Sequence, residues 1–174
     1  RAINKVRYSK NIIDIDDDYV LFSLHYHPEQ TSCPSSYSSP FESDLLVSLA
    51  KKFPNMDIVV KEHPSMLKNK TGLNYMRYRD SQFFSIFNKF HTLKYISGVG
   101  FSDYTKLIEK AKFVVTISGT IVIESSILKT PCVHLGFSWS HGAPGLLTVD
   151  SVDEIEIDKV IDVKNDLLNL KVEE

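Results

Sequence analysis

The feature that most constrains the fold is the stretch at residues 112–136, where two apolar runs flank a Ser-Gly-Thr turn. Residues 113–117 form an uninterrupted apolar run rich in β-branched side chains, which is typical of a parallel strand covered on both faces. The small residues at 118–120 allow a sharp turn, and Pro131 marks the entry to a second apolar run. The pattern therefore predicts a buried strand, a turn, a short helix and a second buried strand.

The helix predicted after this turn has an alternative. Residues 120–123 are indifferent helix formers, so the two apolar runs could also pair as a β-hairpin. Residues 124–129 do not alternate, however, and they end before Pro131 with a basic residue, which suits a buried helix. Unpaired backbone N–H groups at such a helix start favour a phosphate or another anion. Thr120 and Glu124 stand four residues apart and would point to the same side.

Composition excludes several classes of protein. The chain has 174 residues, of which 43% are hydrophobic, so it can form one domain with a substantial core. Its net charge of -2 lacks the basic footprint of a nucleic-acid-binding protein. No apolar run could span a bilayer, and no signal peptide is visible. Two cysteines without CxxC spacing predict neither a disulfide framework nor a zinc knuckle, so we expect a reduced, cytoplasmic setting in which Cys132 packs as a small hydrophobe.

Strands and helices alternate along the chain. Residues 19–24, 56–60 and 93–96 are further predicted strands, and residues 41–53, 75–88 and 104–111 are predicted helices. This order predicts an open, mostly parallel, Rossmann-like sheet with helices on both faces. Residues 1–18 are predicted to be a lead-in, residues 19–150 the Rossmann-like domain, and residues 151–174 an acidic helical tail.

Two local patterns accompany these elements. Ser39 and Glu42 have the spacing of a capping box, with Pro40 at the first helical position, and predict the start of the first helix. A second pattern is a basic patch interleaved with tyrosines between residues 66 and 90; its basic members are Lys68, Lys70, Arg77 and Arg79.

Polar residues follow several of the predicted strands. Right-handed crossovers place the strand-end loops on one rim of the sheet, so residues 26–29, 61–64, 118–124 and the loop after Gly136 should converge there. A cation, an imidazole and turn amides together would suit a diphosphate leaving group. Lys61 and His63 would offset its charge, and Glu124 could accept hydrogen bonds from sugar hydroxyls.

Plainer interpretations of the same residues stay open. His63 could be an ordinary strand-end histidine, Lys61 a solvated lysine, and Glu124 a surface carboxylate. His25, His27 and His63 could in principle hold zinc, but no cysteine or carboxylate arrangement supports a metal site, and we predict none. Ser118 lacks the Gly-x-Ser-x-Gly elbow of a serine hydrolase.

At these positions the chain resembles a known family. The Lys-Glu-His-Pro-Ser-Met sequence at 61–66, the Ser-Gly-Thr-x-x-x-Glu sequence at 118–124 and Pro131-x-Val133 are similar to the C-terminal, nucleotide-sugar-binding half of GT-B glycosyltransferases. The most similar group is that of capsule and surface-polysaccharide biosynthesis, which includes Kdo and sialic acid transferases. The resemblance covers residues 20–145. It implies half of a GT-B architecture, which uses a nucleotide sugar as substrate and needs no cofactor.

The resemblance also assigns roles to particular residues. It implies that His63 and the turn of Ser118, Gly119 and Thr120 bind the nucleotide phosphate, with His63 the candidate catalytic residue. The family often carries Gln-Pro or Gln-Pro-Glu after its early strand, whereas this chain has His-Pro-Glu at 27–29. The candidate substrate-loop residues are therefore His27 and Glu29, together with Trp139 and His141 in the aromatic, glycine-rich loop; Trp139 and His141 could stack on the base or pack the loop.

The leading hypothesis is the donor-binding domain of a glycosyltransferase in bacterial surface-polysaccharide biosynthesis. Its partners would be a nucleotide sugar, a polysaccharide or glycolipid acceptor, and a second, N-terminal GT-B domain that 174 residues cannot contain. Through the full-length protein it would work at the inner face of the membrane. Two rivals stay open: a nucleotide-sugar epimerase, which shares the architecture, and a catalytically inactive binding or assembly module.

Overall fold

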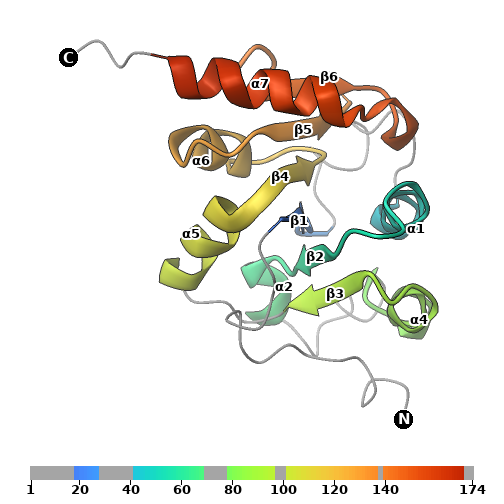
Figure 1. Ribbon diagram of the computed structural model, residues 1–174. Helices are drawn as coiled ribbons and strands as arrows, with labels where there is room; N and C mark the ends of the chain where they lie inside the picture. The colour runs from blue at the N-terminus through green and yellow to red at the C-terminus, as the bar shows by residue number, and fades with distance from the viewer. Residues whose placement is uncertain (1–17, 28–40, 69–77, 97–100, 137–138, 171–174) are drawn as a thin grey trace.

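A computed structural model describes residues 18–27, 41–68, 78–96, 101–136 and 139–170 (Figure 1). These residues form one six-stranded sheet with the order β3-β2-β1-β4-β5-β6, in which every neighbouring pair is parallel. The strands are β1 (Tyr19–Ser23), β2 (Ile58–Lys61), β3 (Leu93–Ile96), β4 (Ala111–Thr116), β5 (Cys132–Leu135) and β6 (Leu146–Val149). The predicted open parallel sheet is confirmed.

Helices cover both faces of the sheet, as predicted (Figure 1). The helices are α1 (Glu42–Lys52), α2 (Pro64–Lys68), α4 (Ser81–Lys89), α5 (Phe101–Lys110), α6 (Ile121–Ile127), the 3-10 helix η3 (Val152–Glu154) and α7 (Ile157–Asn169). Side chains from α1, α4 and α7 join the core on one face, and side chains from α5 and α6 join the core on the other. None of the described helices is long and apolar enough to cross a membrane.

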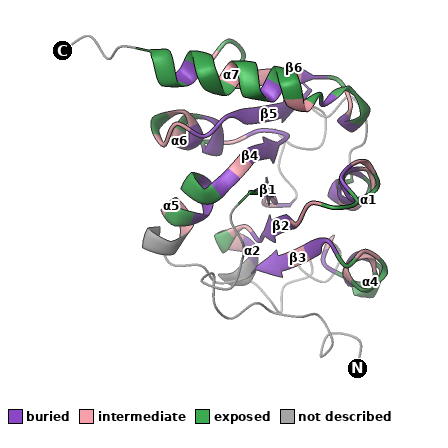
Figure 2. Cartoon of the chain, in the orientation of Figure 1, coloured by how far each residue is buried: buried purple, intermediate pink, exposed green. Residues whose placement is uncertain are grey.

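Strands β1 to β5 are buried along nearly their whole length because both of their faces are covered (Figure 2). Along β1, Val20 and Phe22 pack on the α1 side, whereas Tyr19 and Leu21 pack on the α5 side. This alternation explains why the strands appear in the sequence as continuous apolar runs rather than alternating ones.

The central stretch folds as predicted. Strand β4 ends at Thr116, a turn follows, and α6 carries the chain over to β5, which lies parallel to β4. A β-hairpin would have made these two strands antiparallel, so that alternative is wrong. Gly119 has a φ of 111°, a conformation that side-chain-bearing residues rarely adopt, and this explains the glycine in the turn. Cys132 is buried in β5, and burial raises the pKa of its thiol to about 12, so it packs as a protonated small side chain.

The structure differs from the sequence prediction at three places. Helix α1 begins at Glu42, with Phe41 as its N-cap, whereas Ser39 and Pro40 of the predicted capping box lie outside the described residues. The helix predicted at 75–88 is present as α4, Ser81–Lys89, whose N-cap Asp80 accepts a hydrogen bond from the backbone N–H of Phe83 at 2.8 Å. Strand β6 was not predicted, because its residues are half-buried at the sheet edge and give only a short apolar run.

The core makes a stability prediction. Leu49 of α1 is fully buried against the sheet, whereas Leu168 of α7 is 56% exposed. We expect Leu49→Ala to lower the free energy of unfolding by about 2 to 5 kcal/mol, because it leaves a cavity. The matched variant Leu168→Ala should change it by less than about 0.5 kcal/mol. Urea unfolding followed by circular dichroism measures both values, and equal effects of the two variants would contradict the assignment of α1 to the core.

Candidate functional site

The carboxyl ends of β1, β2 and β4 place their polar residues on one rim of the sheet. The alternation of side chains along β2 continues past its end and divides these residues between the two faces. Lys61 extends to the α5 side, where its Nζ lies 4.0 Å from the ring centroid of Tyr104. Glu62 extends to the other face and contacts Tyr95 and Arg79. The rim therefore carries two polar clusters, one on each side of the sheet.

The first cluster, here called the Glu124 cluster, consists of Lys61, Tyr104, Thr120 and Glu124. The hydroxyl of Thr120 donates a hydrogen bond to Oε1 of Glu124 at 2.8 Å, which confirms that these residues face each other at helical spacing. Oε2 of Glu124 is buried and has no hydrogen-bond partner among the described residues. A buried carboxylate oxygen without a donor is costly, so this atom suits a ligand that brings hydroxyl groups.

Burial shapes the protonation of this cluster. It lowers the pKa of Lys61, and the charges of Glu124 and Glu62 oppose that shift. It raises the pKa of Tyr104 above the ordinary value, and the Glu124 carboxylate adds to that increase. Tyr104 is therefore a neutral phenol at any physiological pH.

The turn before α6 lies next to this cluster. Ser118 is buried, and its carbonyl accepts a hydrogen bond of 2.7 Å from the hydroxyl of Thr116 at the end of β4. Apart from Gly119 and its two chain neighbours, no described residue has an atom within 4 Å of the point that a Cβ at Gly119 would occupy, so this part of the backbone is open to a ligand. The turn thus combines a fixed anchor at residue 118 with an open backbone at residue 119.

His63 follows β2 on the same rim. Its Nδ1 accepts a hydrogen bond of 3.1 Å from the backbone N–H of Ser65, a role that requires Nδ1 to be unprotonated. The neutral ring therefore carries its proton on Nε2 and can donate from that atom. The ring centroid of Tyr26, in the segment after β1, lies 5.9 Å from that of His63.

The second cluster is a buried charge network, defined here as His25, His27, Glu42, Glu62, Arg79 and Tyr95. The Arg79 guanidinium donates to Glu62 through Nε at 2.7 Å and pairs with Oε2 of Glu42 at 3.1 Å. The side chains of all three are 2% exposed or less. Arg79 was predicted to belong to a basic patch, but two carboxylates hold it in the interior, so it does not contribute to such a patch. Lys70 and Arg77 lie outside the described residues, as does the side chain of Lys68.

Glu42 is the most connected carboxylate of the network. Its Oε1 accepts hydrogen bonds from the backbone N–H of His25 at 2.6 Å and from the His25 ring, and its Oε2 lies 2.9 Å from Nε2 of His27. Burial alone would raise the pKa of Glu42, but the two histidines and the Arg79 charge outweigh burial and hold it far below its usual range. In the same way, the carboxylates outweigh burial and raise the pKa of Arg79. Glu42 and Arg79 are therefore ionised throughout the neutral range.

His25 joins the buried charge network to the turn before α6. Its Nδ1 lies 3.0 Å from Oε1 of Glu42, and its Nε2 lies 2.8 Å from the carbonyl oxygen of Ser118. The backbone N–H of Ser118 also points at Nε2, at 3.1 Å. The position of the turn thus depends on this ring.

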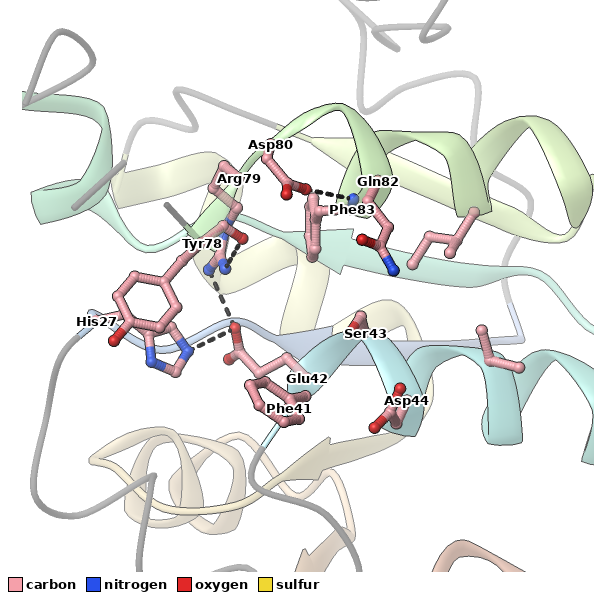
Figure 3. Close-up of a pocket in the computed structure, with 12 residues that line it drawn as sticks. His27, Phe41, Glu42, Ser43, Asp44, Tyr78, Arg79, Asp80, Gln82 and Phe83 are labelled. Carbon is pink, nitrogen blue, oxygen red and sulfur yellow. Dashed lines mark hydrogen bonds and ion pairs between the residues drawn. The ribbon is translucent and has the colours of Figure 1, made fainter. Parts of the chain in front are cut away.

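A cavity of about 760 Å³ lies between α1 and α4, with Glu42 and Arg79 on its floor (Figure 3). The rings of His27 and Tyr78 stack at one end of the cavity, with their centroids 4.6 Å apart. Asp44 and Asp80 are exposed carboxylates on its rim. Among the described candidate site residues, His27 lines this cavity, and its acidic rim disfavours an anionic ligand.

The remaining candidate residues are distributed as follows. Lys61, His63 and the turn at 118–124 lie on one rim, with the segment after β1 between them. Trp139 is 64% exposed and His141 is also exposed, so neither is packed into the core. Glu29 lies outside the described residues. Among the described residues, no group of three histidines, cysteines or carboxylates could hold a metal ion.

Sequence reasoning missed most of the buried charge network. Glu42 was read as a capping residue and Glu62 as part of a motif. The available signal was the placement of Lys61 and Glu62 directly after a strand, because adjacent residues there extend to opposite faces. Their partners at positions 42 and 79 are distant in sequence, and no local pattern pairs them.

Solved structures with the same fold handle activated sugars. The UDP-GlcNAc 2-epimerase of Methanocaldococcus jannaschii, in complex with UDP-GlcNAc and UDP, matches with a TM-score of 0.57 and 19% identity over 98% of this chain and 46% of that chain. KpsC of Thermosulfurimonas dismutans, a β-Kdo 2,7 transferase, matches with a TM-score of 0.53 and 15% identity over 86% of this chain and 46% of that chain. The heptosyltransferase WaaC of Escherichia coli matches with a TM-score of 0.52 and 12% identity over 84% and 42%. No curated protein sequence matches significantly.

The fold is therefore that of one half of a GT-B-type, nucleotide-sugar-related protein, and the chain spans less than half the length of these structures. A sequence model of the UDP-N-acetylglucosamine 2-epimerase family matches residues 2–143. The chain belongs to that family.

The buried charge network predicts a dependence of stability on pH. Because the pKa of Glu42 is depressed in the folded protein, its stabilising contribution is complete above its unfolded value of 4.5 and is lost as the pH falls below that value. We expect Glu42→Gln to lower the free energy of unfolding at pH 7 by about 3 to 5 kcal/mol, because Arg79 loses a buried partner. The difference from wild type should shrink between pH 4.5 and pH 3 in urea titrations.

Asp44→Asn provides the matched control, because Asp44 lies on the same turn of α1 but is exposed. It should change stability by less than about 1 kcal/mol. A Glu42→Gln deficit that stays constant down to pH 3 would contradict the assigned ionisation of Glu42.

Proposed function

We propose that this chain is the nucleotide-sugar-binding domain of a glycosyltransferase that builds a bacterial surface polysaccharide. The observation that carries the proposal is the open Ser-Gly-Thr turn at 118–120, which shares one rim with His63 and with the partnerless Oε2 of Glu124. Phosphate recognition needs N–H donors, and recognition of ribose or hexose needs acceptors for hydroxyl groups. This rim offers both kinds of group, a short distance apart.

Each residue has a role in the proposed complex. The backbone of the turn donates to oxygens of the diphosphate, and His63 donates to another oxygen through Nε2–H and so stabilises the leaving nucleotide. Glu124 accepts a hydroxyl of the sugar nucleotide at Oε2, while Thr120 holds its Oε1. Lys61 acts through the Glu124 cluster, where it offsets the carboxylate charge. The exposed Trp139 is proposed to stack on the base.

A nucleotide-sugar epimerase is the second candidate, and the match to the UDP-N-acetylglucosamine 2-epimerase family favours it. Both candidates use the same nucleotide site and differ in what happens to the sugar. In either case we propose that a second GT-B domain, outside this chain, completes the active centre. A polysaccharide or glycolipid acceptor and a place at the cytoplasmic face of the membrane belong to the transferase proposal.

Calorimetric titration with CMP-, UDP- and GDP-sugars tests the shared site. We expect at least one of these to bind. His63→Ala and Thr120→Val should each weaken its binding about tenfold or more, because a hydrogen bond to a charged group contributes about 1.5 to 3 kcal/mol. His91→Ala, at an exposed histidine in the turn before β3, is the control and should bind like wild type. The absence of a binding signal with every one of these sugar nucleotides would contradict the proposal.

Product analysis separates the two enzymes. UDP-GlcNAc is incubated with the protein joined to its second domain, without any acceptor, and the sugar is examined for inversion at C2. The transferase proposal predicts no C2 epimer with or without an acceptor, and a glycosidic product only when an acceptor is supplied. Accumulation of the C2 epimer without acceptor would establish the epimerase instead.

A further inference from the structure

His25 is 5% exposed and lies between a carboxylate and a peptide group. Glu42 accepts a hydrogen bond from Nδ1–H of the ring, which leaves Nε2 to face both the carbonyl oxygen and the backbone nitrogen of Ser118. The two distances from Nε2 are 2.8 Å to the oxygen and 3.1 Å to the nitrogen. The hydroxyl of Thr116 lies 3.4 Å from the same Nε2 and donates to the same carbonyl.

The two contacts of Nε2 require opposite states of the ring. A neutral ring with its proton on Nδ1 has a lone pair at Nε2, which accepts the N–H of Ser118 but repels the Ser118 carbonyl oxygen. An imidazolium has a proton at Nε2, which donates to that carbonyl and leaves the N–H of Ser118 without this acceptor. Glu42 accepts from Nδ1 in both states, so the choice is made at Nε2 alone.

Four charged or titratable residues surround the ring, three of them from other segments and one from the segment of His25 itself. They are Glu42 of α1, Arg79 before α4, His27 after β1 and His134 of β5. Two carboxylates of the buried charge network face one guanidinium, so one negative charge is left for ring protons on His25 or His27 to balance. His134 adds little positive charge, because burial lowers its pKa and outweighs the opposing hydrogen bond of 2.9 Å from Nδ1 to the carbonyl of Gly136.

We propose that His25 is a positioning residue that couples a proton to the binding of an anionic oxygen at residue 118. As an imidazolium it holds the Ser118 carbonyl and leaves the Ser118 N–H for a phosphate oxygen of the ligand. As a neutral ring, His25 accepts the hydrogen bond from the Ser118 N–H at Nε2, and this N–H is then not available to the ligand. This inference rests on the proposed function, because it assumes that the diphosphate lies against the turn at 118–120.

The direction of the pH effect follows from this exchange. Ligand binding favours the imidazolium, so the protein takes up a proton when the ligand binds. Affinity should therefore rise as the pH falls through the range in which His25 titrates, by at most about tenfold per pH unit for one coupled proton. UDP-GlcNAc is a suitable probe, because each of its phosphates is a diester or anhydride that keeps its charge across neutral pH.

Calorimetry of UDP-GlcNAc binding in several buffers of different ionisation enthalpy measures the coupled proton directly. The observed enthalpy should depend linearly on the ionisation enthalpy of the buffer, with a slope that reports uptake of up to about one proton per ligand. His25→Gln keeps a group that can hydrogen-bond to Ser118 but does not titrate. This variant should bind UDP-GlcNAc with the uptake lost and the affinity independent of pH between 5.5 and 8.

His91→Gln is the matched control and should retain wild-type uptake, because His91 is exposed and remote from the turn. A merely structural role of His25 would lower stability or affinity without removing the uptake. If His25→Gln does not fold, NMR titration of the wild-type histidine rings with and without UDP-GlcNAc gives the same answer. The titration midpoint of His25 should then move to higher pH in the complex, and an unchanged midpoint would overturn the inference.

The possible outcomes distinguish the role of His25 from the proposed function. Binding of UDP-GlcNAc without proton uptake, or with uptake that survives in His25→Gln, overturns the role of His25 and leaves the nucleotide site in place. Absence of binding by every sugar nucleotide overturns the proposed function and this inference with it.

Discussion

One guanidinium, that of Arg79, holds the functional rim of this fold together. It donates to Glu62 after β2, to the backbone carbonyl of His25 after β1 and pairs with Glu42 at the start of α1. These residues lie just beyond β1, just beyond β2 and at the start of α1, and the buried ion pairs fix their relative positions. Burying a guanidinium costs free energy unless its hydrogen-bond and ion-pair partners are all in place. The network therefore favours the arrangement of the rim in which Arg79 contacts all three partners.

The buried charge network and the proposed ligand site lie on opposite faces of the sheet and are linked through His25. The buried charge network lies on the α1 and α4 side of the sheet, whereas the Glu124 cluster lies on the α5 and α6 side. Residues 61 and 62 belong to different clusters because successive side chains of an extended segment point to opposite faces. His25 is the link from the network to the turn, through two contacts with Ser118. The turn at 118–120 is thus held in place by the buried charge network, through His25.

The fold could be predicted because its signals are local. Apolar β-branched runs, their spacing and the proline at position 131 define the strands and the α6 crossover, and all of these lie within a few residues of one another. The turn at 118–120 was found for the same reason. Glu42 and Arg79 could not be found in this way, because their burial depends on partners in other segments. Judged by type alone, an arginine and a glutamate are surface residues.

The structure places the residues of the predicted motifs on one rim of the sheet, but it gives some of them other partners than the sequence indicates. The sequence indicates Lys61 and His63 as the groups that meet phosphate, whereas the structure places Lys61 against Tyr104 and lets His63 donate through Nε2. The family match and the fold support a nucleotide sugar as the ligand.

A crystal structure of the chain with UDP-GlcNAc bound tests the central claim most directly. The account predicts that the diphosphate contacts the backbone at residues 118–120, that a sugar or ribose hydroxyl donates to Oε2 of Glu124, and that Nε2 of His25 contacts the carbonyl rather than the amide of Ser118. A nucleotide bound in the cavity between α1 and α4, with the turn empty, would contradict it.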